Sequence, residues 1–365
     1  MKIVYLKPKS SFIGEQLHSD TLFGAICWGI RQIYGEDELV EMLSRFDRGS
    51  EDFNPPFLIS STFLYTESEK GKMHFLPKPM QKPIWRKIET KEVLDKLKTI
   101  KKVDYLQENL FNGWINGKLT GSELLGNIEL RGDNIIYKQD GEEYLQKNGI
   151  LIEKGYAASI FIENEKGHAT KILKGVDIQR NVINRLSNTT TEGGLFYTHE
   201  TFIGKKGGLY FLIDIKDNTY ENMLNASMRF IEDRGIGGDV SVGKGQFDIE
   251  LPTETGLTHE PGNPDSFTTL SLYYPCDDEI RLFKEHNEKV WYNLRGRKGK
   301  IESAFVSTKD IWKETIQMFG EGSTFPLIAN RGLYGNNPIV KEKPFKIQHY
   351  GFALPVKMKE GGDEI

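Results

Sequence analysis

Cysteine is scarce in this sequence, and long apolar runs are missing from it. Only two cysteines, Cys27 and Cys276, occur among the 365 residues, and neither belongs to a CxxC or Cys/His cluster. We therefore expect neither a disulfide framework nor a cysteine-based zinc site. No run approaches the roughly 18 apolar residues of a membrane helix, and the N-terminus MKIVYLKPKS lacks the apolar region of a secretory signal. These absences indicate a protein of the reducing cytoplasm without a membrane span.

Local signatures of catalysis are also missing. The sequence contains no GxSxG elbow, no HExxH, no paired CxxC and no EF-hand loop. An acidic cluster, Asp277-Asp278-Glu279, has no histidine beside it, so we interpret it as a turn or helix cap rather than a metal site. We therefore expect no catalytic residue, no metal and no cofactor.

The composition is that of a globular protein. Hydrophobic residues make up 38% and charged residues 27%, and the net charge is −4. A negative net charge argues against coating of nucleic acid by the whole surface, but it does not exclude a local basic surface. Glycine provides 37 of the 365 residues, above the usual ~7%, and many glycines stand between strand-like runs. This distribution predicts many tight turns or close backbone approaches.

The first two thirds of the chain predict one elaborated α+β domain, residues 1–251. A helix is expected from His18, with Ser19 or Asp20 as N-cap and Gly35 as its end, because apolar residues recur there at helical spacing. Residues 66–175 are Pro/Lys-rich and then lysine-rich, and we interpret them as an insertion. The remaining expected elements are strands at 2–6, 57–65, 195–203, 209–215 and 246–251 and a helix at 220–232. This order suits a ferredoxin-like (RRM-type) fold.

A smaller second domain is expected at 266–365, after a linker at 252–265 that is rich in proline and glycine. The pattern predicts strands at 268–274 and 304–307, a basic hairpin around 295–300, a helix at 310–319 and a closing strand at 350–358. The predicted fold class is thus α+β, with two ferredoxin-like (RRM-type) domains, the first carrying a large insertion.

A glycine-rich segment between the helix at 220–232 and the following strand is the sharpest local motif. Backbone without Cβ can approach a ligand closely, and successive N–H groups can hold phosphate oxygens. It is neither a Walker A loop nor a GxGxxG turn, since it leads from a helix into a strand. A turn that serves only topology is the alternative. The candidate phosphate-binding residues here are Arg234, Gly237, Gly238, Ser241, Gly243, Lys244 and Gly245.

A second motif places basic and amide side chains before a hydroxyl-rich loop and an aromatic strand. Arginine forks and amides suit phosphate oxygens, 2′-hydroxyls and base edges. A solvated polar hairpin is the alternative. The candidates are Arg180, Asn181, Asn184 and Arg185.

Two further features carry charge. His18 and Ser19 stand at a helix start, where an anion binds readily and where His18 could act as a general acid or base, or the segment could simply cap the helix. Residues 78–102 hold nine basic and three acidic side chains, which is either a binding surface or a solvated face.

Taken together, these motifs resemble the RAMP superfamily of CRISPR RNA-binding proteins. The resemblance lies in Leu17-His-Ser-Asp-Thr-Leu-Phe-Gly-Ala25, in Arg180-Asn-Val-Ile-Asn-Arg185 and in the Gly237–Gly245 loop, and it points more narrowly to the family of fourth Csm subunits of type III-A effector complexes. It implies a non-catalytic subunit that grips the 5′ repeat-derived tag of CRISPR RNA for antiviral defence. It also implies two protein partners, the large polymerase-like Csm subunit and the backbone RAMP subunit.

Two other functions stay open on the sequence. RAMP processing nucleases use histidine, so His18 could serve a metal-independent endoribonuclease that cuts precursor CRISPR RNA. The second alternative is a scaffold that binds protein neighbours and barely touches RNA. Such a scaffold would not need the basic side chains Arg180, Arg185 and Lys244.

Overall fold

Four strands and two helices form the centre of the N-terminal part of the chain. The computed structural model describes residues 1–68, 71–82, 90–131, 134–139, 142–147, 149–154, 161–163, 169–301, 311–329, 331–342 and 346–360. Within it, β16 (Phe247–Glu254), β1 (Lys2–Pro8), β15 (Gly207–Ile215) and β4 (Phe63–Ser68) lie side by side in that order. Helix α1 (Ser19–Tyr34) follows β1, and α6 (Glu221–Arg234) connects β15 to β16. The chain thus follows the β-α-β-β-α-β order that the sequence predicts for this region.

The predicted strand at 57–65 is two strands. The segment β3 (Phe57–Ile59) pairs with β15, and β4 begins only at Phe63. Between them the chain bends toward α1, since the Thr62 N–H donates to the Leu17 carbonyl at 2.9 Å. Helix α1 ends at Gly35 as predicted, where φ is +104°. Its N-cap is His18, which makes no capping side-chain bond, so the prediction of Ser19 or Asp20 as N-cap was wrong.

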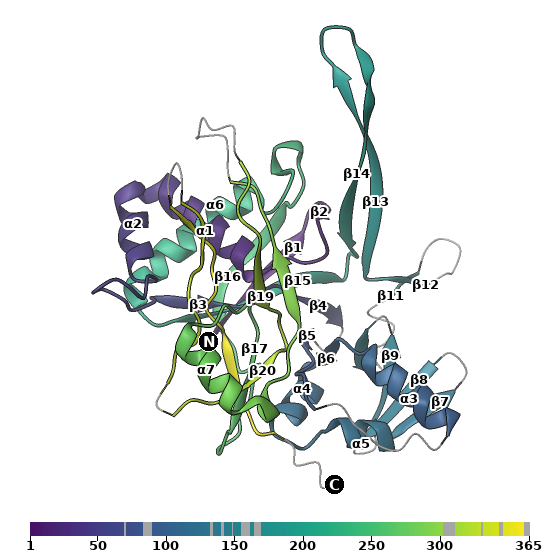
Figure 1. The fold of residues 1–365 in the computed structure, drawn as a ribbon. Coiled ribbons are helices and arrows are strands. Elements are labelled where there is room, and N and C mark those ends of the chain that lie inside the picture. Colours follow the sequence, from purple (N-terminus) through teal and green to yellow (C-terminus); the bar gives the residue numbers. More distant parts are fainter. Residues whose placement is uncertain are drawn as a thin grey trace.

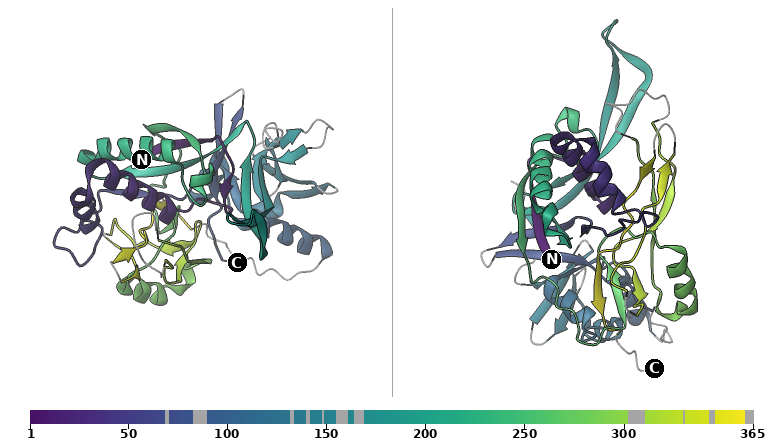
Figure 2. Two further views of the ribbon diagram at one scale, coloured as in Figure 1. Left: turned by 90° about the horizontal axis from the view of Figure 1, so that it is seen from above. Right: turned by 90° about the vertical axis from the view of Figure 1, so that its left-hand side faces the viewer.

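Helices α1 and α6 lie against each other on the sheet (Figures 1 and 2). A Cβ added to Gly29 of α1 would stand 2.9 Å from the Ser227 Cβ of α6, so this contact requires glycine. The apolar stripe Leu22, Phe23, Ile26 and Ile30 is buried beneath. A second short helix, α2 (Glu36–Ser44), continues from α1.

Most strands of the predicted insertion, residues 66–175, extend the same sheet, whereas β11 (Phe161–Glu163) and β12 (Ala169–Lys171) form a separate two-stranded sheet. The sheet continues from β4 through β5 (Gly71–Pro77), β6 (Tyr105–Gln107), β10 (Ile150–Glu153), β9 (Glu142–Lys147) and β8 (Asn134–Gln139) to β7 (Ile128–Arg131). The insertion also contains helices α3 (Lys91–Lys101), α4 (Glu108–Ile115) and α5 (Gly121–Gly126). Its strand β11 pairs with β12.

A long β-hairpin projects from the body of the molecule (Figure 1). It consists of β13 (Leu173–Asn184) and β14 (Thr189–Ile203), and the short strand β2 (Phe12–Ile13) pairs with the base of β14. The candidate residues Arg180 to Arg185 and the predicted strand at 195–203 both lie in it.

The C-terminal residues form small sheets and one α-helix within the described residues. Strands β20 (Thr324–Pro326), β17 (Ser266–Thr269) and β23 (Pro355–Met358) make one sheet, and α7 (Asp277–Glu285) starts at the acidic cluster with a capping box from Glu279. The other pairs are β18 (Leu294–Arg297) with β19 (Ile316–Phe319) and β21 (Ile339–Lys341) with β22 (Ile347–Gln348). Short 3₁₀ turns lie at Asn218–Tyr220, Val240–Val242 and Asn287–Lys289.

Of two predictions for this region, one was wrong and the other concerns residues that the structure does not describe. The helix predicted at 310–319 was wrong, because Ile316–Phe319 pair with β18 and bury Met318. The strand predicted at 304–307 lies outside the described residues. A second ferredoxin-like unit therefore stays a prediction.

One hydrophobic cluster includes residues from both parts of the chain, although the C-terminal part also has a cluster of its own. The Tyr350 ring lies 4.9 Å from the ring of Phe23 in α1, and Phe352 lies 5.9 Å from Phe46. The Tyr350 hydroxyl also accepts the Ile59 N–H at 3.0 Å. The C-terminal part is thus docked on the first domain by buried aromatics. Among the described helices, none has the length and apolarity to cross a membrane.

Candidate nucleic-acid interface

A buried carboxylate joins the two basic motifs that the sequence singles out. Arg180 of β13 donates to Glu200 Oε1 at 2.7 Å, and Lys244 of the glycine-rich loop donates to Glu200 Oε2 at 2.6 Å. Ser11 donates to the same carboxylate at 2.6 Å. Arg180 also donates to Asp239 of the loop at 2.9 Å. The base of the hairpin and the glycine-rich loop are therefore one connected structure.

The electrostatics of this cluster favour an ionised Glu200. Burial of the carboxyl alone would raise its pKa, but the hydrogen bonds from Lys244, Ser11 and Arg180 outweigh burial and lower the pKa of Glu200 to about 2. Two cations face two carboxylates here, Glu200 and Asp239, so the cluster is close to neutral. Arg180 and Lys244 are thus engaged in internal ion pairs, and their contact with RNA stays a prediction.

The glycine-rich loop owes its shape to close backbone approaches. Gly245 has φ +66°, and a Cβ there would lie 1.9 Å from the Ile236 carbonyl oxygen. Its N–H donates to the Ser11 carbonyl at 2.8 Å, so this N–H is used inside the protein rather than offered to a ligand. By contrast, Gly237, Gly238, Ser241 and Gly243 are exposed, and a Cβ on Gly243 would meet nothing within 4 Å.

The hairpin presents exposed amide, basic and apolar side chains. Asn181 is exposed on β13, Asn184 Oδ1 accepts the Leu186 N–H at 2.9 Å, and Arg185 stands in the turn with Leu186, which is 97% exposed. On β14, Leu195, Phe196 and Tyr197 are exposed as well. Large apolar groups in solvent on a projecting arm indicate a surface that contacts another molecule.

Arg234 lies elsewhere, at the end of α6. Its guanidinium stands 5.9 Å from the rings of both Trp28 and Phe230. It thus packs against the aromatic surface of the helix pair.

His18 and Ser19 lie at the junction with the C-terminal part. His18 Nδ1 contacts Glu321 Oε1 at 2.7 Å, and the Ser61 hydroxyl donates to the same oxygen. Ser19 is fully buried, and its hydroxyl accepts the Leu272 N–H at 3.1 Å. The expectation that Ser19 contacts RNA is corrected accordingly, because its side chain stays inside the protein.

A second buried pair strengthens this junction. Asp20 accepts two hydrogen bonds from Arg297, at 2.9 and 2.8 Å, and the His349 Nδ1 stands 3.7 Å from Asp20. Burial lowers the pKa of His349 to about 4, so this imidazole is neutral at pH 7.

Sequence reasoning missed the residues that organise the interface. Glu200 and Ser11 stand outside any recognisable motif, and Asp239 lies within the glycine-rich loop but is not among its candidate residues. Glu200 shares one face of β14 with Phe196 and Thr198, but nothing in that local pattern marks it as the buried residue of the three. Its cationic partners could not be read from the sequence.

The fold and this interface define an α+β protein in which a projecting hairpin and a glycine-rich loop are clamped to a ferredoxin-like sheet. Residues 15–248 match the model of the RAMP superfamily, and residues 263–358 match the model of the CRISPR Csm4 C-terminal domain. The chain belongs to the RAMP superfamily.

Individual relatives agree with this assignment. The CRISPR system Cms protein Csm4 of Methanocaldococcus jannaschii is 27% identical over 352 residues, which is 88% of this chain and 85% of that protein. The Csm4 protein of Thermococcus onnurineus is 27% identical over 253 residues, 68% of this chain and 67% of that protein. A chain of the Csm3–Csm4 subcomplex from the type III-A CRISPR-Cas interference complex has a similar fold, with a TM-score of 0.63 at 21% identity, over 98% of this chain and all of that chain. A chain of the Csm1–Csm4 cassette in complex with cA4 gives a TM-score of 0.58 at 19% identity, over 98% of both chains.

Proposed function

We propose that this protein is the non-catalytic RNA-binding subunit of a type III-A CRISPR effector ribonucleoprotein, where it grips the 5′ repeat-derived tag of CRISPR RNA. The observation that carries the proposal is the set of hydrogen bonds from Arg180 and Lys244 to Glu200, which we call the clamp. It fixes the base of an exposed hairpin against an exposed glycine-rich loop, so both present one preformed surface. A preformed surface binds with a smaller entropic cost than one that must be ordered on binding.

The geometry divides the candidate residues into two roles. Arg180, Lys244 and Gly245 hold the surface in shape, because their polar groups bond within the protein. Asn181, Asn184 and Arg185 with the exposed loop residues Gly237, Gly238, Ser241 and Gly243 would contact RNA. Exposed Phe196 and Tyr197 would stack on bases. A surface with few free cations is better suited to binding RNA at one specific site than to coating it uniformly.

Two protein partners follow from the same proposal, the large polymerase-like Csm subunit and the backbone RAMP subunit. Support comes from the full-length similarity of this chain to chains solved with Csm3 or with Csm1. We infer that residues 266–365 form a smaller ferredoxin-like unit that mainly serves these protein contacts. The protein would act in the cytoplasm, which suits its two free thiols, Cys27 and Cys276.

Catalysis is not part of this proposal. In a nuclease, His18 would need to exchange a proton with a 2′-hydroxyl or a leaving oxygen. Its Nδ1 is instead engaged by Glu321, and its ring is largely buried. This arrangement supports a structural role at the junction between the two parts of the chain.

The RNA that copurifies with the native complex tests the proposed function. We expect a population of RNAs that share one fixed 5′ repeat-derived tag. RNA without a common 5′ end, or none at all, would contradict the proposal and favour the protein scaffold.

A further inference from the structure

A groove of about 900 Å³ opens between the insertion and the C-terminal part of the chain. Three segments provide most of its lining: α3 of the insertion, the Pro77–Lys82 segment after β5, and the Trp291–Arg295 segment that leads into β18. The lysine-rich region that the sequence singles out thus forms part of a concave surface. Part of it, residues 83–89, lies outside the described residues.

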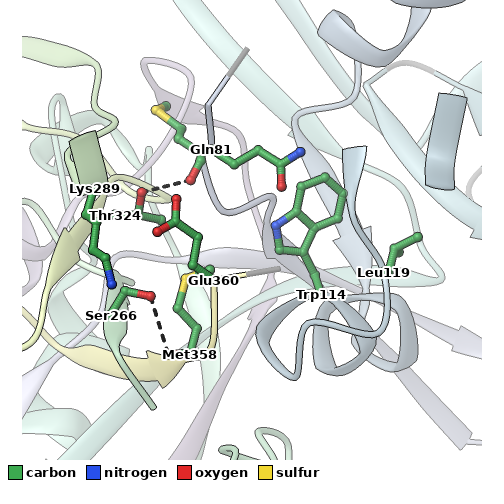
Figure 3. Close-up of a pocket in the computed structure, with 9 residues that line it drawn as sticks. Gln81, Trp114, Leu119, Ser266, Lys289, Thr324, Met358 and Glu360 are labelled. Atoms are coloured by element: carbon green, nitrogen blue, oxygen red, sulfur yellow. Dashed lines mark hydrogen bonds between the residues drawn. The ribbon is translucent and has the colours of Figure 1, made fainter. Parts of the chain in front are cut away.

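The groove is built into the fold, because the Pro77–Lys82 segment is fastened to the C-terminal part. The Met80 N–H donates to the Gly322 carbonyl at 2.8 Å, and the Thr324 hydroxyl donates to the Met80 carbonyl at 2.8 Å. The bond from Thr324 is drawn as a dashed line in Figure 3. Gly322 has φ +82°, and a Cβ there would stand 2.8 Å from the Lys78 carbonyl. Next to this junction, a cavity of only about 10 Å³ lies between Trp114 and Glu360, which is room for about one water. The groove is therefore the space available to a larger ligand.

Positive charge exceeds negative charge in the lining. Its cations are Lys78, Lys82, Lys98, Lys101 and Arg295, and its carboxylates are Glu15, Asp104 and Glu321. The Glu321 carboxylate is already bonded to His18 and Ser61. Lys82, Lys101 and Arg295 are exposed, and within the described residues their side chains make no hydrogen bond or ion pair. An anionic ligand would therefore find charged partners that are free to bind it.

An exposed aromatic side chain lines the same groove. Tyr292 is 51% exposed, yet its ring is held in place by Phe319, with ring centroids 4.8 Å apart. The neighbouring Trp291 is fixed through its backbone, which exchanges hydrogen bonds with Thr324 at 3.1 and 2.8 Å. A groove that combines an exposed aromatic ring with unpaired cations suits single-stranded nucleic acid, whose bases stack on the ring and whose phosphates pair with the cations.

The groove is continuous with the interface at the hairpin and the glycine-rich loop. The loop rests on residues 11–17, since a Cβ on Gly238 would stand 3.2 Å from Ile13 and a Cβ on Gly237 would stand 3.3 Å from Leu17. The next residues along this segment, Glu15, Gln16 and His18, line the groove, as does Leu173 at the start of β13. A single-stranded RNA bound at the glycine-rich loop would thus reach the groove directly.

We propose that this groove binds a single-stranded RNA segment that continues from the hairpin and the glycine-rich loop, with a base stacked on Tyr292 and phosphates bound by Lys101 and Arg295. The inference rests on the proposed function, because it extends the same RNA. Continuity with the loop favours RNA over an acidic peptide of a partner, which would fit the same charges.

Substitutions in the full chain test the groove with a synthetic single-stranded RNA. Tyr292→Ala should weaken binding about tenfold, whereas Tyr292→Phe, which keeps the ring, should stay within about twofold of the parent. Lys101→Ala should lower the slope of log K against log salt by about 0.7. Lys102→Ala is the matched control, because Lys102 is exposed on the same segment but does not line the groove. Thermal melts should show that all four variants fold.

Photo-crosslinking of RNA that carries 4-thiouridine gives the independent readout. Crosslinks to Trp291–Arg295 or to α3 would support the groove. If Arg185→Ala weakens binding while the groove variants bind like the parent, and crosslinks stop at the hairpin and loop, the groove assignment is overturned and the proposed function survives. Groove variants that keep RNA but lose a partner subunit would assign the groove to a peptide instead. A parent protein that binds no RNA would overturn the proposed function as well.

Discussion

Lys244 donates to Glu200 at 2.6 Å, and this contact joins a glycine-rich loop to a β-hairpin 44 residues away in the chain. Glu200 itself has no exposed surface, while Lys244 and Arg180 each keep about a quarter of their side chains in solvent. One internal carboxylate thus determines how two surface motifs are presented.

Replacement of this carboxylate should loosen the clamp. We expect Glu200→Gln to reduce the free energy of unfolding by about 2 kcal/mol, below the ~3–5 kcal/mol for a fully buried pair, because both cations retain access to water. Hydrogen exchange should rise in residues 237–245 and at the base of the hairpin. Glu250→Gln, at an exposed carboxylate of β16, is the control and should leave both unchanged. Unchanged exchange in Glu200→Gln would contradict the clamp.

Arg185 should contribute charge to RNA binding without a role in stability. It stands in the hairpin turn and is exposed. Arg185→Ala should lower the slope of log K against log salt by about 0.7, as expected for one phosphate contact on a single strand, and leave the melting temperature unchanged. Arg185→Lys keeps the charge and should restore the slope. Equal binding by all three proteins at several salt concentrations would show that the turn does not touch RNA.

Two glycines in one loop should respond very differently to alanine. Gly245→Ala would place a Cβ 1.9 Å from the Ile236 carbonyl and disrupt the loop, whereas Gly243→Ala meets no atom within 4 Å. Both have positive φ, so each substitution also costs about 1–2 kcal/mol of backbone strain. We expect chemical denaturation to give a clearly larger loss for Gly245→Ala than for Gly243→Ala. Similar losses would mean that the loop relaxes freely around Gly245.

Stability should fall as the pH drops from about 6.5 to about 4. His349 has a pKa of about 4 in the folded protein, lowered from 6.5 by burial and by Lys313 and Arg297, while Asp20 opposes the shift. The unfolded chain therefore takes up the proton first, so the contribution of His349 is complete above pH 6.5 and is lost toward pH 4. His349→Gln should flatten the dependence of unfolding free energy on pH in this window, and His286→Gln, at an exposed histidine, should not. Parallel pH profiles for all three proteins would contradict a buried neutral His349.

Glu200 contributes in a lower window. Its pKa falls from 4.5 to about 2 on folding, so its stabilisation is present above pH 4.5 and is lost as the pH falls toward 2. The pH ranges in which His349 and Glu200 change the stability are separate enough that the effect of His349→Gln can be measured between pH 5 and 7.

The purified protein should leave a repeat-containing precursor RNA full length near pH 7.5 without divalent metal. His18→Ala should not change the products, because His18 is bonded to Glu321 at the junction rather than to a second acid–base group suited to the leaving oxygen. A single cut within the repeat that His18→Ala abolishes would replace the proposed function with a processing nuclease.

The sequence alone was enough to predict the elements whose signal is local. Helix α1 follows from apolar spacing and ends at Gly35, the β-α-β-β-α-β order follows from the succession of patterns, and the glycine-rich loop and polar hairpin are visible as motifs. The acidic start of α7 was also predicted as a cap. Each of these depends on residues close together in the chain, where periodicity and turn chemistry are sufficient.

Only the tertiary structure decided which of those residues are free to bind. Arg180 and Lys244 meet a carboxylate 20 and 44 residues away, and Ser19 is buried against Leu272, 253 residues away. The stretch at 316–319 became a strand because β18 offered a pairing partner, although its local pattern favours a helix. A charge or hydroxyl acts on a ligand only when no internal partner satisfies it, and the fold sets those partners through contacts that span most of the chain.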